Sequence, residues 1–482
     1  MNSFIIDLFK QFKDENVRYC HFKSNNNLEP ALSGVDDLDL LVATGDVDKF
    51  NEILSRNGFR IAFDRGAPVT PYVYHYFGMD PKTGLLVHLH VYFKIVTGGS
   101  IFKNHAIRVE KMFLDEAQPN GPAGVYIPSS EADCILFILR KFIEQPSIVE
   151  HYLFLKDWKN INLELQWLIE RSDREKISNL VTKWLPEIEV QFFNDCLDLM
   201  ISKGTILKRA RLGLKMRKFI HNTVVSEYKA EIIRFFQFFL AFIKNRLRLH
   251  RKNRYLFPGG QIIAFVGSEA SGKSTLSKEC ASWLSERFDV SHIHLGKPKK
   301  NWRTVFIWYA IYIFSFFKSK LSSKSKNHDK SVEKEETSIN NPHPIVAWLD
   351  SIDRKLAIKK YFRKLMQGGI VITDRYPSRY MDGPRIQANS GFYKYLRIKE
   401  EKNYESIPNP DLVFRAQAPL EVTLNRNSAR DKPEPEAFVK ERYKIARNIN
   451  FKFSDIIIVD TTEPYEQSVL KVKNIIWKKS NS

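Results

Sequence analysis

Hydrophobic and polar positions alternate with two different periods in the first part of the chain. Residues 1–130 mix both, and the apolar runs over 38–43 and 85–96 predict strands. The first twenty residues carry early acidic side chains and no small-residue cleavage site. They predict an amphipathic helix and argue against an export signal.

The remaining pattern divides into a helical part and an alternating part. The helical period dominates from residue 131, becomes strongly basic from 206, and ends at Pro258 and Gly259. Strand-like and helical segments then alternate, as in a parallel α/β sheet, with a polar insertion over 318–344 that is typical of a mobile loop. We therefore expect an α+β domain over 1–130, a helical and basic linker region over 131–256, and an α/β domain over 257–482.

Composition narrows the compartment and the partners. With 482 residues and 43% apolar side chains, the chain is large enough for two to four domains. Four cysteines without a CxxC pair fit a reducing compartment, so we expect a cytoplasmic protein. The net charge of +20 favours nucleotides, nucleic acid or an acidic lipid surface without choosing among them.

The clearest chemical motif lies between an apolar strand over 262–266 and a helical segment that starts at Lys273. It fits G-x-x-x-x-G-K-[ST] at every fixed position. Its glycines allow backbone amides to surround a phosphate, Lys273 can reach the β- and γ-phosphates of ATP, and Ser274 can ligate Mg²⁺. The predicted ATP-binding residues are Gly267, Ser268, Glu269, Ala270, Ser271, Gly272, Lys273, Ser274 and Thr275.

Two further segments of this domain carry candidate chemistry. A strand over 370–373 ends in Asp374 and Arg375, and charged residues at the carboxyl ends of parallel strands lie where ligands bind. Arg426 and Arg430 follow a later strand, and arginine suits phosphate. The simpler alternatives are a turn cap for Asp374 and a solvated helix face for the two arginines.

These motifs together resemble the thymidylate kinase family of P-loop kinases, over about residues 261–480 apart from the insertion. The matching features are an acidic residue in the loop, a charged strand end, a Pro-Asp-Leu before the next strand, an arginine-bearing lid and a closing Val-Asp strand. The residues that carry them are Glu269, Asp374, Arg375, Tyr376, Pro410, Asp411, Leu412, Arg426, Arg430, Val459 and Asp460.

The resemblance implies a role for each catalytic candidate. Glu269 would face the sugar of the acceptor, and Asp374 and Arg375 would lie between the two nucleotides. Arg426 and Arg430 would close over the transferring phosphoryl group. Residues 294–303 depart from the family's acceptor-binding segment, so a nucleoside monophosphate and a glycan-related molecule both remain open as acceptors. Proteins of bacterial surface-polysaccharide clusters resemble this arrangement of an N-terminal module and a kinase-like domain.

A second candidate site lies in the first domain. Asp37 and Asp39 are spaced so that a strand would place both carboxylates on one face, where they repel unless a divalent cation or a proton lies between them. This resembles the Asp-x-Asp of nucleotidyltransferase-fold proteins, although His88 and His90 stand where a third carboxylate is expected. The alternatives are an acidic surface turn and structural histidines.

Two apolar segments with basic flanks suggest a surface for other partners. The 13 residues over 305–317 are too few for the ~20 that cross a bilayer, so they predict an interfacial or buried helix. The basic linker adds phenylalanines over 235–242. Peripheral contact with an anionic membrane, packing between domains and a homodimer stay open, whereas nucleic acid ranks below them.

The reaction that the sequence predicts is Mg²⁺- and ATP-dependent phosphoryl transfer, carried by Lys273, Ser274, Asp374 and Arg375. Two alternatives remain. In one, Asp37 and Asp39 catalyse nucleotidyl transfer and the ATP site is regulatory. In the other, the chain is a membrane-associated ATP-binding scaffold without catalysis.

Overall fold

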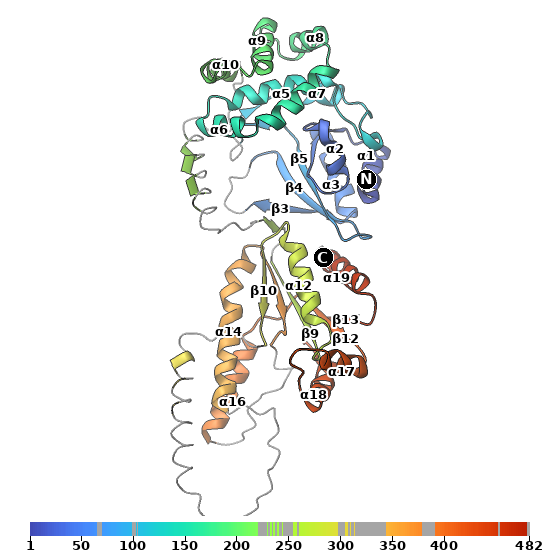
Figure 1. Cartoon of the computed structure of the whole chain (residues 1–482), viewed down its shortest axis with the longest axis vertical. Helices are drawn as coiled ribbons and strands as arrows, with labels where there is room; N and C mark the ends of the chain where they lie inside the picture. The colour runs from blue at the N-terminus through green and yellow to red at the C-terminus, as the bar shows by residue number, and fades with distance from the viewer. Residues whose placement is uncertain are drawn as a thin grey trace, which may run out of the picture. The chain divides into compact units, whose positions relative to one another are not determined.

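The computed structural model describes most of the chain and divides it into two compact units, Met1–Arg251 and Lys252–Ser480. It describes residues 1–64, 70–98, 103, 105–219, 229, 232–233, 235–236, 239–240, 243, 254–257, 260–296, 304–306, 309, 313, 344–377, 391–451 and 454–479. Figure 1 shows the elements of both units. Each unit has its own sheet and is described by itself.

The first unit contains a mixed sheet with the order β1-β2-β5-β4-β3. Only β2 and β5 run parallel, and the other neighbours are antiparallel. The strands are β1 (Tyr19–His21), β2 (Leu38–Val42), β3 (Arg60–Asp64), β4 (Val73–Met79) and β5 (Leu86–Tyr92). A short pair, β6 (Val96–Thr97) and β7 (His105–Ala106), follows, so the strand expected over 85–96 is interrupted after Tyr92.

Helices cover one face of this sheet. Alternate residues of a strand point to opposite faces, so every second residue of β2 points towards these helices. Leu38 and Leu40 pack in a core with helix α1, whose buried residues recur with the helical period, and with α3. Asn2 caps α1 by accepting a hydrogen bond from the Phe4 amide. The helices on this face are α1 (Ser3–Asp14), α2 (Leu28–Leu32) and α3 (Val47–Arg56), with 3-10 turns over Asn25–Asn27, Thr44–Asp46 and Pro122–Gly124 nearby in the chain. Helix α4 (Glu110–Asp115) instead packs in the core on the opposite face through Met112 and Phe113.

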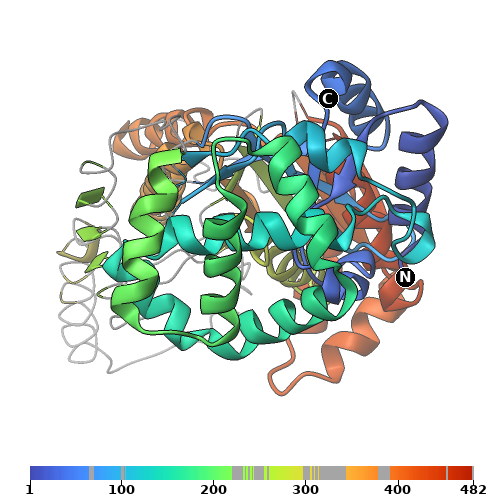
Figure 2. The ribbon, with the colours of Figure 1, turned by 90° about the horizontal axis from the view of Figure 1, so that it is seen from above.

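Six further helices pack on the opposite face and around one another (Figures 1 and 2). Leu41 and Tyr92 of the sheet share a core with α5, which is buried along most of its length. The chain region expected as a linker thus contributes α5 to α10 to the first unit. They are α5 (Ser130–Glu144), α6 (Ile148–Lys156), α7 (Trp158–Arg171), α8 (Arg174–Trp184), α9 (Val190–Ile201) and α10 (Ile206–Phe219).

The second unit contains the parallel α/β sheet that the sequence predicts. Its order is β10-β11-β9-β12-β13, and every neighbouring pair is parallel. The strands are β9 (Gln261–Gly267), β10 (Val290–His294), β11 (Ile370–Asp374), β12 (Leu412–Gln417) and β13 (Ile456–Asp460), with β8 (Arg254–Leu256) before them. The helices are α12 (Lys273–Ser285), α14 (Pro344–Met366), α16 (Gly391–Glu405), α17 (Leu420–Ser428), α18 (Glu436–Arg447) and α19 (Tyr465–Lys479).

Strand β9 lies at the centre of this sheet, between β11 and β12. Ile262, Ala264 and Val266 point to one face, where they share a core with residues of α14, α16 and α18. The connection after β9 leads to β10 on one side of it, and the connection after β11 leads to β12 on the other side. The carboxyl end of β9 is therefore the point where ligands bind in such sheets. This topology brings the loop after β9 next to the carboxyl ends of β10, β11 and β12.

Two sequence predictions fall on parts of the chain that the structure does not describe. The polar insertion lies outside the described residues except for Pro344, at its end. Most of the apolar run over 305–317 lies outside them as well. None of the helices within the described ranges combines the length and apolar character that a membrane span needs.

The packing of α10 on α5 gives a prediction about stability. A Cβ atom on Gly213 would lie 2.5 Å from the Phe142 carbonyl oxygen and 2.8 Å from Pro146 Cδ. We expect Gly213→Ala to lower the free energy of unfolding by about 1–2 kcal/mol, because overpacking costs more than helix propensity returns. Denaturant unfolding would measure it, with Gly45→Ala as the control because no atom lies within 4 Å of that Cβ. Equal stability of both variants would contradict the packing.

Candidate functional site

The loop between β9 and α12 has the conformation that its two fixed glycines allow. Gly267 has a φ of +148°, and a Cβ there would lie 2.5 Å from the Ala416 carbonyl oxygen on β12. Gly272 has a φ of +87° and is the residue before α12. Since L-residues rarely adopt these angles, glycine lets the chain turn from strand to helix beside a neighbouring strand. The amides at the start of α12 therefore lie at the carboxyl end of the sheet.

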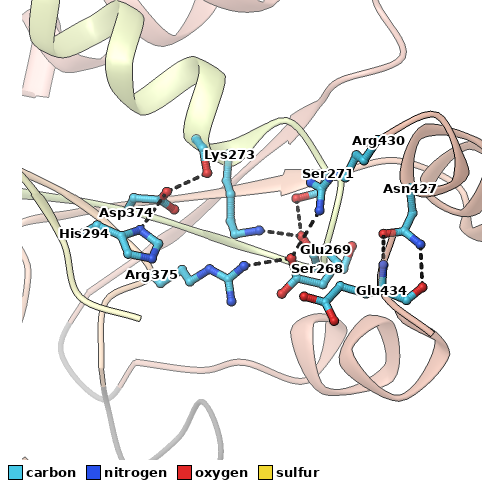
Figure 3. Close-up of polar contacts among 11 residues, drawn as sticks. Ser268, Glu269, Ser271, Lys273, His294, Asp374, Arg375, Asn427, Arg430 and Glu434 are labelled. Carbon is cyan, nitrogen blue, oxygen red and sulfur yellow. Dashed lines mark hydrogen bonds and ion pairs between the residues drawn. The ribbon is translucent and has the colours of Figure 1, made fainter. Parts of the chain in front are cut away.

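Lys273 is held inside this loop, as Figure 3 shows. Its side chain is 4% exposed, and its ammonium donates a hydrogen bond to the Ser268 carbonyl oxygen at 2.8 Å. Burial lowers the pKa of Lys273 to about 8, and the nearby Arg375 guanidinium acts in the same direction. An ammonium in this environment gains from an anionic partner, because such a partner restores the solvation that burial removed.

Ser274 and Asp374 meet beside the lysine. The Ser274 hydroxyl donates to Asp374 Oδ2 at 2.6 Å, and His294 Nδ1 lies 3.2 Å from the same oxygen. The second oxygen, Oδ1, is buried and has no hydrogen-bond partner among the residues that the structure describes. A hydroxyl and a carboxylate with a spare oxygen are hard donors of the kind that Mg²⁺ prefers.

An acidic side chain gathers two arginines on the other side of Lys273 (Figure 3). Arg375 Nη2 donates to Glu269 Oε2 at 2.7 Å, and Arg430 Nη1 lies 3.8 Å from that oxygen. Burial alone would raise the pKa of Glu269, but the charges of Lys273 and Arg375 outweigh it and hold the pKa below its usual value. Arg375 has a φ of +60°, a strained conformation that non-glycine residues adopt mostly at functional sites.

A cavity of about 400 Å³ opens beside the loop. Lys273, Ser274, Arg426 and Arg430 line it, together with Thr461 at the end of β13. The Arg426 guanidinium donates to the carbonyl oxygen of Thr461 at 2.8 Å and to its hydroxyl at 3.3 Å. Basic groups from the loop, from α17 and from the turn that follows α17 thus surround one space at the carboxyl ends of the strands.

The predicted residues of the second unit therefore occupy one region, whereas the two carboxylates of the first unit lie elsewhere. Asp37 Oδ1 is 2.6 Å from His88 Nδ1, and Asp39 Oδ1 is 2.9 Å from His90 Nδ1. Asp37 precedes β2 and Asp39 lies within it. Within the described ranges, no group of three or more His, Cys, Asp or Glu side chains is arranged to hold a metal ion. The assignment of Asp37 and Asp39 as metal ligands stays a prediction.

Two residues at the site were not singled out from the sequence. His294 ends β10 and contacts Asp374, at the start of the segment that departs from the kinase family. The Thr461 hydroxyl donates to the Ser271 carbonyl oxygen at 2.9 Å and so connects the loop with the end of β13. Both follow the rule that ligand-site residues lie at the carboxyl ends of parallel strands, and this rule could have identified them.

Fold and site together define an α/β domain with a phosphate-binding loop. No family model matches the chain. The C-terminal half is similar to the uncharacterized ATP-binding protein YghS of Escherichia coli K12, with 28% identity over 220 residues, which are 43% of this chain and 88% of that protein. It is also similar to the uncharacterized ATP-binding protein YghR of the same strain, with 23% identity over 230 residues, 44% of this chain and 83% of that protein. A structure of thymidylate kinase from Candida albicans covers 46% of this chain and 93% of its own at 17% identity, with a TM-score of 0.31.

The position of Thr461 leads to a prediction about the loop. Thr461→Val preserves the side-chain shape but removes the hydroxyl that donates to Ser271. We expect the free energy of unfolding to fall by about 1–2 kcal/mol, because a buried carbonyl oxygen loses its partner. Denaturant unfolding is the measurement. Thr462→Val is the matched control, since its hydroxyl donates to the exposed Asp460 side chain. Equal losses in the two variants would refute the role of Thr461.

Proposed function

We propose that the second unit binds Mg²⁺–ATP and transfers the γ-phosphoryl group to a small-molecule acceptor. The observation that carries the proposal is the gathering of charged groups at one phosphate-binding loop. Lys273 and the Ser274–Asp374 pair lie at its end, Arg426 and Arg430 line the cavity beside it, and Arg375 contacts its Glu269. The acceptor that we propose is a nucleoside monophosphate of the dTMP kind or a glycan-related molecule.

The ATP end of the site rests on the loop and on helix α12. Amides at the start of a helix favour an anion, and the buried Lys273 ammonium adds a full positive charge. Ser274 and the spare oxygen of Asp374 would hold Mg²⁺, which neutralises phosphate charge when bound. The names of YghS and YghR, which describe ATP-binding proteins, support this part of the proposal.

The arginines favour phosphoryl transfer over binding alone. Phosphoryl transfer is catalysed mainly by positioning and by neutralising charge on the equatorial oxygens. Arg426 and Arg430 line the cavity from α17 and the residues after it, while Arg375 lies at the end of β11. The contact of Arg375 with Glu269 uses Nη2, so the guanidinium has further N–H donors for an acceptor phosphate.

The proposal is tested by product formation. The full chain is incubated with γ-labelled ATP, Mg²⁺ and a panel of acceptors that includes dTMP, other monophosphates and sugars. We expect a labelled acceptor to form, and we expect its rate of formation to fall by at least about a hundredfold in Lys273→Ala. The reason is that the loss of a group positioned on the phosphates removes several kcal/mol of transition-state stabilisation. Lys278→Ala is the control, since this lysine lies on the same helix but is exposed.

The other outcomes favour the alternatives. Pyrophosphate release that Asp39→Ala abolishes would support nucleotidyl transfer in the first unit. Binding of ATP without any product would support a non-catalytic scaffold. Either result, if no labelled acceptor forms, would refute the kinase.

The buried lysine also predicts a proton linkage. Free Lys273 has a pKa of about 8, so about half of it is neutral at pH 8. A bound triphosphate favours the charged form, so ATP binding at pH 8 should take up part of a proton, whereas at pH 6 the lysine is already protonated. Calorimetry in buffers of different ionisation enthalpy measures the uptake. Lys273→Arg should bind ATP without this proton uptake, because arginine stays charged. The same uptake in wild type and variant would contradict the linkage.

A further inference from the structure

A second cavity lies in the first unit, and the proposed kinase reaction does not use it. Its volume is about 660 Å³. Side chains of the sheet, of the loop after β1 and of helices α5 to α7 line it. The aromatic ring of Tyr92, at the end of β5, forms part of its wall.

Three cationic side chains converge in this cavity. The Lys23 and Lys103 ammonium groups lie 3.7 and 4.5 Å from the centre of the Tyr92 ring, and Lys103 also donates to the Tyr92 hydroxyl. Arg140 joins them from α5 and is close enough to repel both lysines. Burial lowers the pKa of Lys23, and it lowers the pKa of Lys103 to about 8.

Among the described residues, one carboxylate contacts this group of cations directly. Asp39 Oδ1 lies 3.3 Å from the Lys23 ammonium and also contacts His90. Burial lowers the pKa of His90 to about 4, so this histidine is neutral at pH 7. In the part of the chain that the structure describes, no carboxylate is within 4.0 Å of the Lys103 ammonium or the Arg140 guanidinium. Around the Tyr92 ring, three cationic side chains therefore gather with one contacting carboxylate, while Lys141, Lys156, Glu144, Glu150 and Asp157 line the rest of the cavity.

We propose that this cavity binds the phosphate group of a small phosphate monoester, held by Lys23, Lys103 and Arg140 without a metal ion. A phosphate monoester carries close to two negative charges at pH 7, which suits a cluster of three cationic side chains. Arginine and lysine are the side chains that bind phosphate most strongly, and a site that is largely buried strengthens each contact. Asp39 then serves as the counter-ion that positions Lys23.

The rest of the lining indicates what the phosphate is attached to. Glu144, Glu150 and Asp157 contribute carboxylates from α5, α6 and the residue between α6 and α7, and Phe154 contributes an aromatic ring. Carboxylates accept hydrogen bonds from hydroxyl groups, and the cavity is large enough for more than a phosphate. The ligand class is therefore a phosphorylated polyol such as a sugar phosphate.

Lysine acylation tests the site in the full chain. Lys273→Ala is used throughout so that the phosphate loop contributes little, and EDTA removes divalent ions. Acetic anhydride at pH 8 modifies accessible neutral amines, and mass spectrometry measures each lysine. We expect glucose 1-phosphate to slow the modification of Lys23 and Lys103 at least about fivefold, since a bound phosphate protonates and covers them. Lys176, which is exposed on α8, should react unchanged.

Calorimetry with glucose 1-phosphate compares its binding to the variants. Arg140→Gln should weaken glucose 1-phosphate binding about tenfold, as expected for the loss of one charge-assisted contact. Lys176→Gln should leave it unchanged. Inorganic phosphate should bind more weakly than glucose 1-phosphate.

Three results would overturn the proposal. The first is no protection of Lys23 and Lys103 by either probe at millimolar concentration. The second is protection that appears only with Mg²⁺ and disappears in Asp39→Asn, which would make the site a metal site. The third is equal binding of phosphate and glucose 1-phosphate, which would show that the cavity does not recognise the polyol part of the ligand. If Arg140→Gln does not fold, the acylation experiment, in which Arg140 is unchanged, decides whether the proposal holds. None of these readouts depends on ATP turnover.

Discussion

The hydrogen bond from Ser274 to Asp374 is the interaction on which the arrangement of the nucleotide site depends. It joins the first turn of α12 to the end of β11, two elements that are 100 residues apart in the sequence. The Asp374 carboxylate is buried, so it cannot exchange the Ser274 hydroxyl for water without cost. The contact fixes the direction of α12 relative to the sheet and leaves one carboxylate oxygen of Asp374 available. The positions of Lys273 and of the loop amides follow from it, because they belong to the same turn.

The two units solve a similar electrostatic problem at the ends of their strands. In the second unit, the charges of Lys273, Arg375 and Arg430 face Glu269 and Asp374. In the first unit, Lys23, Lys103 and Arg140 face Asp39. In both, the cations exceed the acids, and burial makes the excess costly. An anionic ligand offsets that cost, so the same physical argument leads to a phosphate at both sites.

The sequence predicted the phosphate loop, β9 and the start of α12 because these depend on neighbouring residues and on glycine at two backbone positions. It also predicted a parallel sheet and placed Asp374 at a strand end. It could not predict that Asp39 lies opposite His90, because this depends on the register between β2 and β5, which are separated by two strands in the chain. The packing of α5 against the first sheet was missed for a similar reason. A helical period shows that one face is apolar but not which surface covers it.

The state of Glu269 determines how the arginines become available to a ligand. Burial favours the neutral carboxyl, but Lys273 and Arg375 outweigh it, so the carboxylate remains ionised at neutral pH. Protonation therefore cannot release Arg375 under those conditions. An anionic ligand can compete for the guanidinium, whose 2.7 Å contact with the buried Glu269 uses one of its N–H groups. A phosphate group meets this requirement, because its oxygens accept two hydrogen bonds from one guanidinium and carry more charge than a carboxylate. Glu269 thus keeps the arginine in place and makes its release depend on the charge of the ligand.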